Sequence, residues 1–128
     1  PVHWRQPRGS RIDLRICQDK YARALRSESS QRKATDWLSF NEKFHSIIAA
    51  ASHNERLLEL IGEIQSDAVG PILGYASRMP HGLMEENIKQ HEDILVALER
   101  RDGNAARTAM TNHILRTTEI VTRWMESR

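Results

Sequence analysis

The sequence predicts an all-α fold, an antiparallel bundle of helices joined by short connections. Apolar residues recur at intervals of three and four along most of the chain, which is the spacing of one helix face. Polar stretches and stretches with Gly and Pro separate these runs, and no run alternates as a half-buried strand would. With 128 residues and 39% hydrophobic content, the chain has the size of one domain that buries a core. These observations predict a helical bundle.

The first half of the chain predicts a pair of helices. Residues 11–28 are expected to form the first helix, and the polar residues 27–34 are expected to connect it to the next. Thr35 or Asp36 can cap the helix over 35–52, because its side-chain oxygen accepts a hydrogen bond from a free backbone N–H. The expected inner stripe of the first helix is Ile12, Ile16, Tyr21 and Leu25.

The second half predicts three more helices. The first of them is expected to kink or break near Val69, because a proline follows there, and the next is expected over residues 84–100. The candidate caps are Ser52 or Asn54 for the first of the three, and Asp102 or Asn104 for the last. The inner face of 84–100 is expected to be Ile88, His91, Ile94, Leu95 and Leu98. The last inner stripe is Ala106, Met110, His113, Thr117, Ile120, Val121 and Trp124.

Charge and cysteine content limit the function classes. The net charge is +2, from 19 basic and 17 acidic residues, so the sequence does not indicate a nucleic-acid-binding surface. Cys17 is the single cysteine, so the chain cannot form an internal disulfide, and a cytoplasmic location is expected. No apolar run approaches the roughly 20 residues that span a bilayer, so no membrane partner is expected.

Three histidines and one asparagine form the main functional signal. Asn41 and His45 lie one turn apart on the same side of the expected helix 35–52, as does Phe44. His91 and His113 each fall on the apolar face of a later helix. Buried polar side chains of this kind either form hydrogen bonds or bind something. The pattern therefore predicts that the four side chains converge from three helices.

Such a group could bind a divalent metal ion. Neutral imidazole is the commonest protein ligand for zinc, nickel, copper and ferrous iron, and three histidines leave coordination positions open. The amide oxygen of Asn41 would add a ligand without a charge. Because the metal's charge would then be uncompensated, a small carboxylate is the expected partner.

Other interpretations of these residues remain open. The histidines could be hydrogen-bonded core residues of a metal-free structural or dimerising bundle. A metal-dependent, hydrolase-like enzyme would need a general base, and Glu42 is the nearest candidate, although it points about 100° away from Asn41 on an ideal helix. A di-iron site would need a second Glu-x-x-His pair, and Ile88 and Met110 occupy the positions that its glutamate would take. We expect no catalytic residues and no enzyme activity.

Two ordered sets of motifs resemble a known family. The first set is Asn41-x-x-Phe44-His45, Ala51-Ser52-His53-Asn54 and Leu57-Leu58. The second is His91-Glu92-x-Ile94-Leu95-x-Ala97-Leu98, Arg101-Asp102, Ala105-Ala106, Met110 and His113. Together, the two sets resemble the FadR-type C-terminal (FCD) domain, the ligand-sensing part of GntR-family transcription regulators. The match runs without obvious gaps from about Tyr21 to Trp124.

The resemblance implies a bundle with a central cavity for a metal and a ligand. Many members hold a divalent metal there through one aspartate and three histidines, which correspond to Asn41, His45, His91 and His113. Asparagine at the first position departs from the family pattern. Zinc is the expected metal on purification, with nickel, iron and manganese as alternatives. Effectors of metal-bearing members are small organic acids or sugar acids, whereas some metal-free members sense acyl-CoA. We expect Tyr75, Arg78, Asn87 and Asn112 to bind the effector.

The resemblance also divides the chain and implies partners. Residues 1–10 read as an irregular leader, and residues 11–128 as the FCD-like domain. The family's winged-helix domain and its first FCD helix are not recognisable, so DNA binding is expected only through the parent protein. An alternative alignment that takes Leu14-Arg15-x-x-x-Asp19 as the opening helix requires a deletion before Asn41. Regulators of this type usually work as homodimers.

Overall fold

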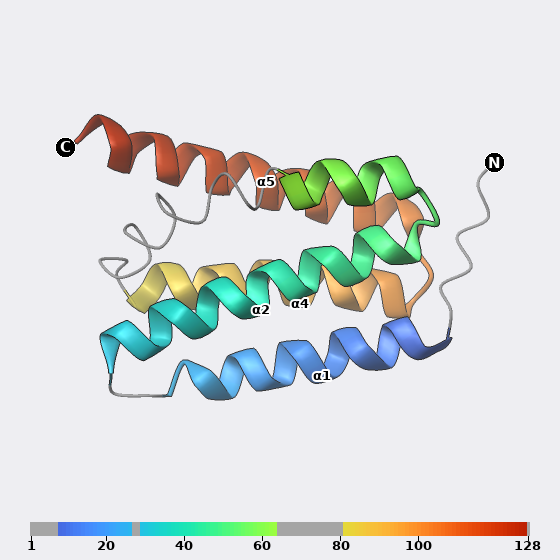
Figure 1. Cartoon of the computed structure of the whole chain (residues 1–128), viewed down its shortest axis with the longest axis horizontal. Coiled ribbons are helices and arrows are strands. Elements are labelled where there is room, and N and C mark those ends of the chain that lie inside the picture. The colour runs from blue at the N-terminus through green and yellow to red at the C-terminus, as the bar shows by residue number, and fades with distance from the viewer. Residues whose placement is uncertain (1–7, 27–28, 64–80, 128) are drawn as a thin grey trace. The chain divides into compact units, whose positions relative to one another are not determined.

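The computed structural model describes residues 8–26, 29–63 and 81–127, and it is all-α over these residues. No strand occurs in the described ranges, so the predicted fold class is confirmed. Residues 55–63 form a short helical segment. The longer helices are α1 (Arg8–Ala24), α2 (Ser30–Ala51), α4 (His81–Glu99) and α5 (Gly103–Glu126) (Figure 1).

The chain forms two compact units, Pro1–Met79 and Pro80–Arg128. In the first unit α1 packs against α2, and in the second α4 packs against α5. Each pair is antiparallel, as the course of the ribbon in Figure 1 shows. Among the described helices, none combines the length and the apolar character that a membrane span requires.

The buried face of α1 differs from the predicted one. Ile12 and Ile16 are 61% and 47% exposed, so the prediction that they line the core is wrong. A helix turns about 100° per residue, which places both side chains about 160° from Leu14, the most deeply buried residue of α1. The buried face of the helix is Leu14, Cys17, Gln18, Tyr21 and Leu25. The predicted stripe had joined residues from two opposite faces.

Contacts with α2 explain which face of α1 is buried. The Tyr21 ring stacks on the Phe40 ring, with 6.0 Å between the centroids and 13° between the planes. The Cys17 thiol donates a hydrogen bond to the Phe40 carbonyl at 3.7 Å. Burial raises the pKa of the Cys17 thiol, which favours the protonated donor.

Both helices of the first unit begin earlier than predicted. The Ser29 hydroxyl accepts a hydrogen bond from the Arg32 N–H at 3.2 Å, so Ser29 caps α2 in place of Thr35 or Asp36. Residues 31–34 (Gln, Arg, Lys and Ala), predicted as part of the connection, are good helix formers and continue α2. α1 begins at Arg8, inside the predicted leader, and residues 1–7 lie outside the described ranges.

A left-handed residue separates α2 from the helical segment 55–63. His53 has a φ of 57°, and the Asn54 side-chain oxygen accepts a hydrogen bond from the Leu57 N–H at 3.0 Å. Of the two candidate caps, Asn54 therefore begins the segment, whereas Ser52 ends α2. The kink expected near Val69 lies outside the described residues.

The second unit is a helical hairpin. α4 ends at Glu99, and Arg101, with a φ of 57°, lies in the turn that follows. The Asp102 carboxylate caps α5 by accepting a hydrogen bond from the Ala105 N–H at 3.0 Å. Asp102, and not Asn104, is therefore the cap. α4 begins at His81, before the predicted residue 84. Its buried side chains are Met84, Asn87, His91, Ile94, Leu95 and Ala97, whereas Ile88 and Leu98 of the predicted face are half-buried.

The inner stripe predicted for α5 is only partly buried. His113 is 3% exposed, whereas Ala106, Met110, Thr117 and Ile120 are half-buried. The side chains of Val121 and Trp124 are not among those described. His113 is thus the most deeply buried described side chain of α5, although it is polar.

Candidate metal centre

In the first unit, α2 carries Asn41 and His45 one turn apart. Both side chains are half-buried, and Phe44 beside them is 1% exposed. The His45 ring stands edge-on to the Phe44 ring, at 5.6 Å between centroids and 85° between planes. The helix therefore places an amide and an imidazole on one face, next to the apolar interior of their own unit. Their convergence with the other two histidines stays a prediction.

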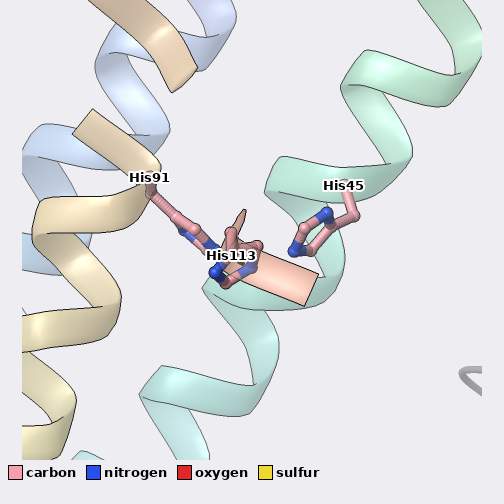
Figure 2. A group of neighbouring side chains, drawn as sticks. All are labelled: His45, His91 and His113. Atoms are coloured by element: carbon pink, nitrogen blue, oxygen red, sulfur yellow. Dashed lines mark hydrogen bonds between the residues drawn. The ribbon is translucent and has the colours of Figure 1, made fainter. Parts of the chain in front are cut away.

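In the second unit, α4 and α5 bring His91 and His113 together. The side chains of the three candidate histidines are drawn in Figure 2. The Nε2 atoms of His91 and His113 are 3.2 Å apart, and the rings meet edge to face at 4.7 Å and 78°. His91 is 0% exposed and His113 is 3% exposed. The hairpin thus buries two imidazoles whose Nε2 atoms lie 3.2 Å from each other.

Burial also sets the protonation of His113. Because the charged form loses its hydration, the pKa of His113 falls to about 4. The ring is therefore neutral at pH 7. Its Nδ1 lies 2.7 Å from the Oε1 of Gln90. A neutral imidazole with one nitrogen hydrogen-bonded is the form that binds divalent metals.

The geometry of this pair fits a metal ion. Zinc binds imidazole nitrogen at about 2.0–2.1 Å in tetrahedral sites, so two such nitrogens on one ion lie about 3.3 Å apart. The observed Nε2–Nε2 separation is 3.2 Å. The same separation also suits a hydrogen bond between the two rings. The separation of the two nitrogens is therefore compatible with two ligands on one ion.

The four candidate effector-binding residues differ in their placement. Asn87 is 8% exposed and lies one turn before His91 on the buried face of α4. Asn112 is exposed on α5. Tyr75 and Arg78 lie outside the described residues. Among the described candidates, Asn87 is thus the one that lies on the histidine face of its helix.

Gln90 is a residue of this region that the sequence analysis missed. It contacts His113 across the hairpin and hydrogen-bonds Glu86 on its own helix at 3.2 Å. The spacing of Glu86 and Gln90 is visible in the sequence. The partner on α5 is not visible, because it depends on how the two helices are rotated against each other.

A scan against protein-family models identifies the family. The FCD domain matches residues 10–116, a range that contains Asn41, His45, His91 and His113. The chain belongs to the FCD domain family. FCD domains are the C-terminal effector domains of GntR-family regulators, and they are regulatory ligand-binding domains. The resemblance identified from the sequence motifs is thereby confirmed. No curated protein and no solved structure gives a significant match to this FCD domain.

Proposed function

We propose that this FCD domain senses a small organic acid or sugar acid for a GntR/FadR-type transcription regulator, through a bound divalent metal. The observation that carries the proposal is the buried pair of His91 and His113, whose Nε2 atoms have the separation of two ligands on one ion. In an effector domain, an ion with open coordination positions has a direct use, because it can bind the acid itself.

In this proposal the metal is held by the four ligands predicted from the sequence. His45, His91 and His113 each provide one ring nitrogen, and Asn41 adds its amide oxygen. All four ligands are neutral, so the ion keeps its charge and attracts a carboxylate into an open position. Bound there, the metal supplies Lewis-acid attraction for the effector's anionic oxygen. Asn87, with Tyr75, Arg78 and Asn112, provides donors for the rest of the effector.

The effector acts by shifting the equilibrium between two arrangements of the domain. It changes the parent regulator only if it binds one arrangement of the domain more tightly than another. We propose that the arrangement sets the spacing of paired winged-helix domains in a homodimer, so that DNA is contacted only through those domains. A cytoplasmic location fits this role and stays a prediction.

Ligand-dependent stabilisation tests the proposal. We expect Zn²⁺ to raise the melting temperature of protein stripped with a chelator, and an organic or sugar acid to raise it further only when Zn²⁺ is present. At a ligand concentration of 100 times Kd, the stabilisation is about 2.7 kcal/mol. Mg²⁺, which prefers oxygen ligands, is the control. Equal stabilisation by an acid without metal would instead indicate a metal-free sensor. Turnover of esters or sugar acids that is lost in His91→Ala would indicate the hydrolase alternative.

Asn41→Asp is expected to tighten Zn²⁺ binding. The substitution replaces a neutral oxygen ligand by a carboxylate, so we expect at least about a tenfold lower Kd, which corresponds to about 1.4 kcal/mol. Isothermal titration calorimetry measures the change. Asn104→Asp is the matched control, because it adds the same charge at an exposed position on the first turn of α5. Weaker binding in Asn41→Asp would show that Asn41 is not a ligand.

A further inference from the structure

A chain of polar contacts crosses the second unit from its surface to the histidine pair. The Arg116 Nε donates a hydrogen bond to Glu86 Oε1 at 2.8 Å. The Gln90 Nε2 donates to the same carboxylate oxygen at 3.2 Å. The Oε1 of Gln90 lies 2.7 Å from His113 Nδ1, and His113 Nε2 lies 3.2 Å from His91 Nε2. α4 supplies Glu86, Gln90 and His91, and α5 supplies His113 and Arg116.

The chemistry of these groups fixes which atom donates and which atom accepts in each hydrogen bond of this network. An ionised carboxylate accepts hydrogen bonds and does not donate them, and Glu86 is paired with the guanidinium of Arg116. The amide nitrogen of Gln90 must therefore face Glu86, and its carbonyl oxygen must face His113. A carbonyl oxygen only accepts, so the proton of His113 resides on Nδ1. An imidazole with its single proton on Nδ1 has a lone pair on Nε2.

We infer that Gln90 is a positioning residue that holds His113 in the Nδ1–H tautomer, with Nε2 directed to receive the metal. This inference rests on the proposed function and deepens it. Glu86 and Arg116 act one step further away, because they fix the orientation of the Gln90 amide. The second ring nitrogen of a metal-binding histidine commonly donates to a carboxylate, a carbonyl or water, and this contact sets the tautomer and the ring orientation.

The amide of Gln90, in place of a carboxylate, affects how strongly the site attracts an anionic effector. A carboxylate at position 90 would orient the imidazole equally well but would add a negative charge next to the site. Gln90 orients His113 without lowering the positive charge of the ion. The network therefore preserves the attraction for an anionic effector that the four neutral ligands create.

Histidine tautomers can be read in the metal-free protein by long-range ¹H–¹⁵N NMR correlation. We expect His113 to carry its proton on Nδ1 in the wild-type chain. Gln90→Met keeps the length of the side chain and removes the acceptor, so a mixture of tautomers is expected, with Zn²⁺ affinity lowered 10- to 100-fold. Gln90→Glu keeps an acceptor and is expected to retain the Nδ1–H tautomer. Lys89→Met is the matched control, because Lys89 is an exposed neighbour paired with Asp93.

A more conservative variant, Glu86→Gln, keeps the inference testable if Gln90→Met does not fold. Glu86→Gln preserves size but can donate as well as accept, so it releases the Gln90 amide and is expected to produce a smaller share of the other tautomer. An Nε2–H tautomer of His113 in the wild type, or a tautomer unchanged in both variants, would overturn the inference. If the tautomers behave as expected but the wild-type protein binds no Zn²⁺, the role of Gln90 stands and the proposed metal-dependent function fails.

Discussion

His91→Ala is expected to weaken Zn²⁺ binding by more than about a hundredfold and to leave the purified protein without bound metal. Loss of a residue that only supports a ligand costs 10- to 100-fold in affinity, so loss of a ligand should cost more. His91 is 0% exposed, and its Nε2 lies 3.2 Å from the Nε2 of His113. Elemental analysis of wild type and variant, after incubation with Zn²⁺ and desalting, measures the effect. We expect about one metal per chain in the wild type and almost none in the variant.

The controls for this experiment address the loss of packing. His53→Ala removes an exposed histidine, and we expect it to retain the metal. His91→Asn leaves a smaller cavity than alanine, and its retained fold can be checked by circular dichroism. If His91→Ala and His91→Asn both fold and still bind one metal with unchanged affinity, His91 is not a ligand. Metal-free protein after reconstitution would favour a metal-free sensor, with Asn41 as the decisive departure from the family pattern.

The metal-free protein is expected to lose stability between pH 6.5 and pH 4 because of His113. The pKa of this residue is about 6.5 when the chain is unfolded and falls to about 4 in the fold. Between these values the unfolded chain binds a proton that the folded chain does not bind. The contribution is therefore fully present above pH 6.5 and is lost as the pH falls toward 4. A difference of this size corresponds to about 3 kcal/mol in the free energy of unfolding.

Comparison with a variant isolates this contribution from the carboxylates that titrate in the same range. His113→Asn keeps a donor near the position of Nδ1 but does not titrate, so its urea unfolding should depend less steeply on pH. The difference from wild type should change by about 1.4 kcal/mol per pH unit within the window. His53→Asn is the matched control, because His53 is exposed and its left-handed φ of 57° suits asparagine. Parallel pH curves for wild type and His113→Asn would contradict the prediction.

The sequence by itself determined the fold class and the family, and at two helix starts it offered two candidate caps, of which Asn54 and Asp102 are the observed ones. Spacings of three and four residues, with caps at Asn54 and Asp102, describe interactions within one or two turns of a helix. Such interactions depend on the local order of residues, so they can be read directly. The order of the motifs around Asn41 and His91 was sufficient to identify an FCD domain.

The tertiary structure decided which faces the helices use. In α1, two apolar patterns compete, and the stacking of Tyr21 on Phe40 selects the face of Leu14 and leaves Ile16 exposed. The contact between Gln90 and His113 likewise joins two helices whose relative rotation no local spacing encodes. The buried face of α1 and the contact between Gln90 and His113 both depend on how two helices pack together. The face that is buried is the one that gives the packed helix pair the lowest free energy, and this free energy depends on residues of both helices.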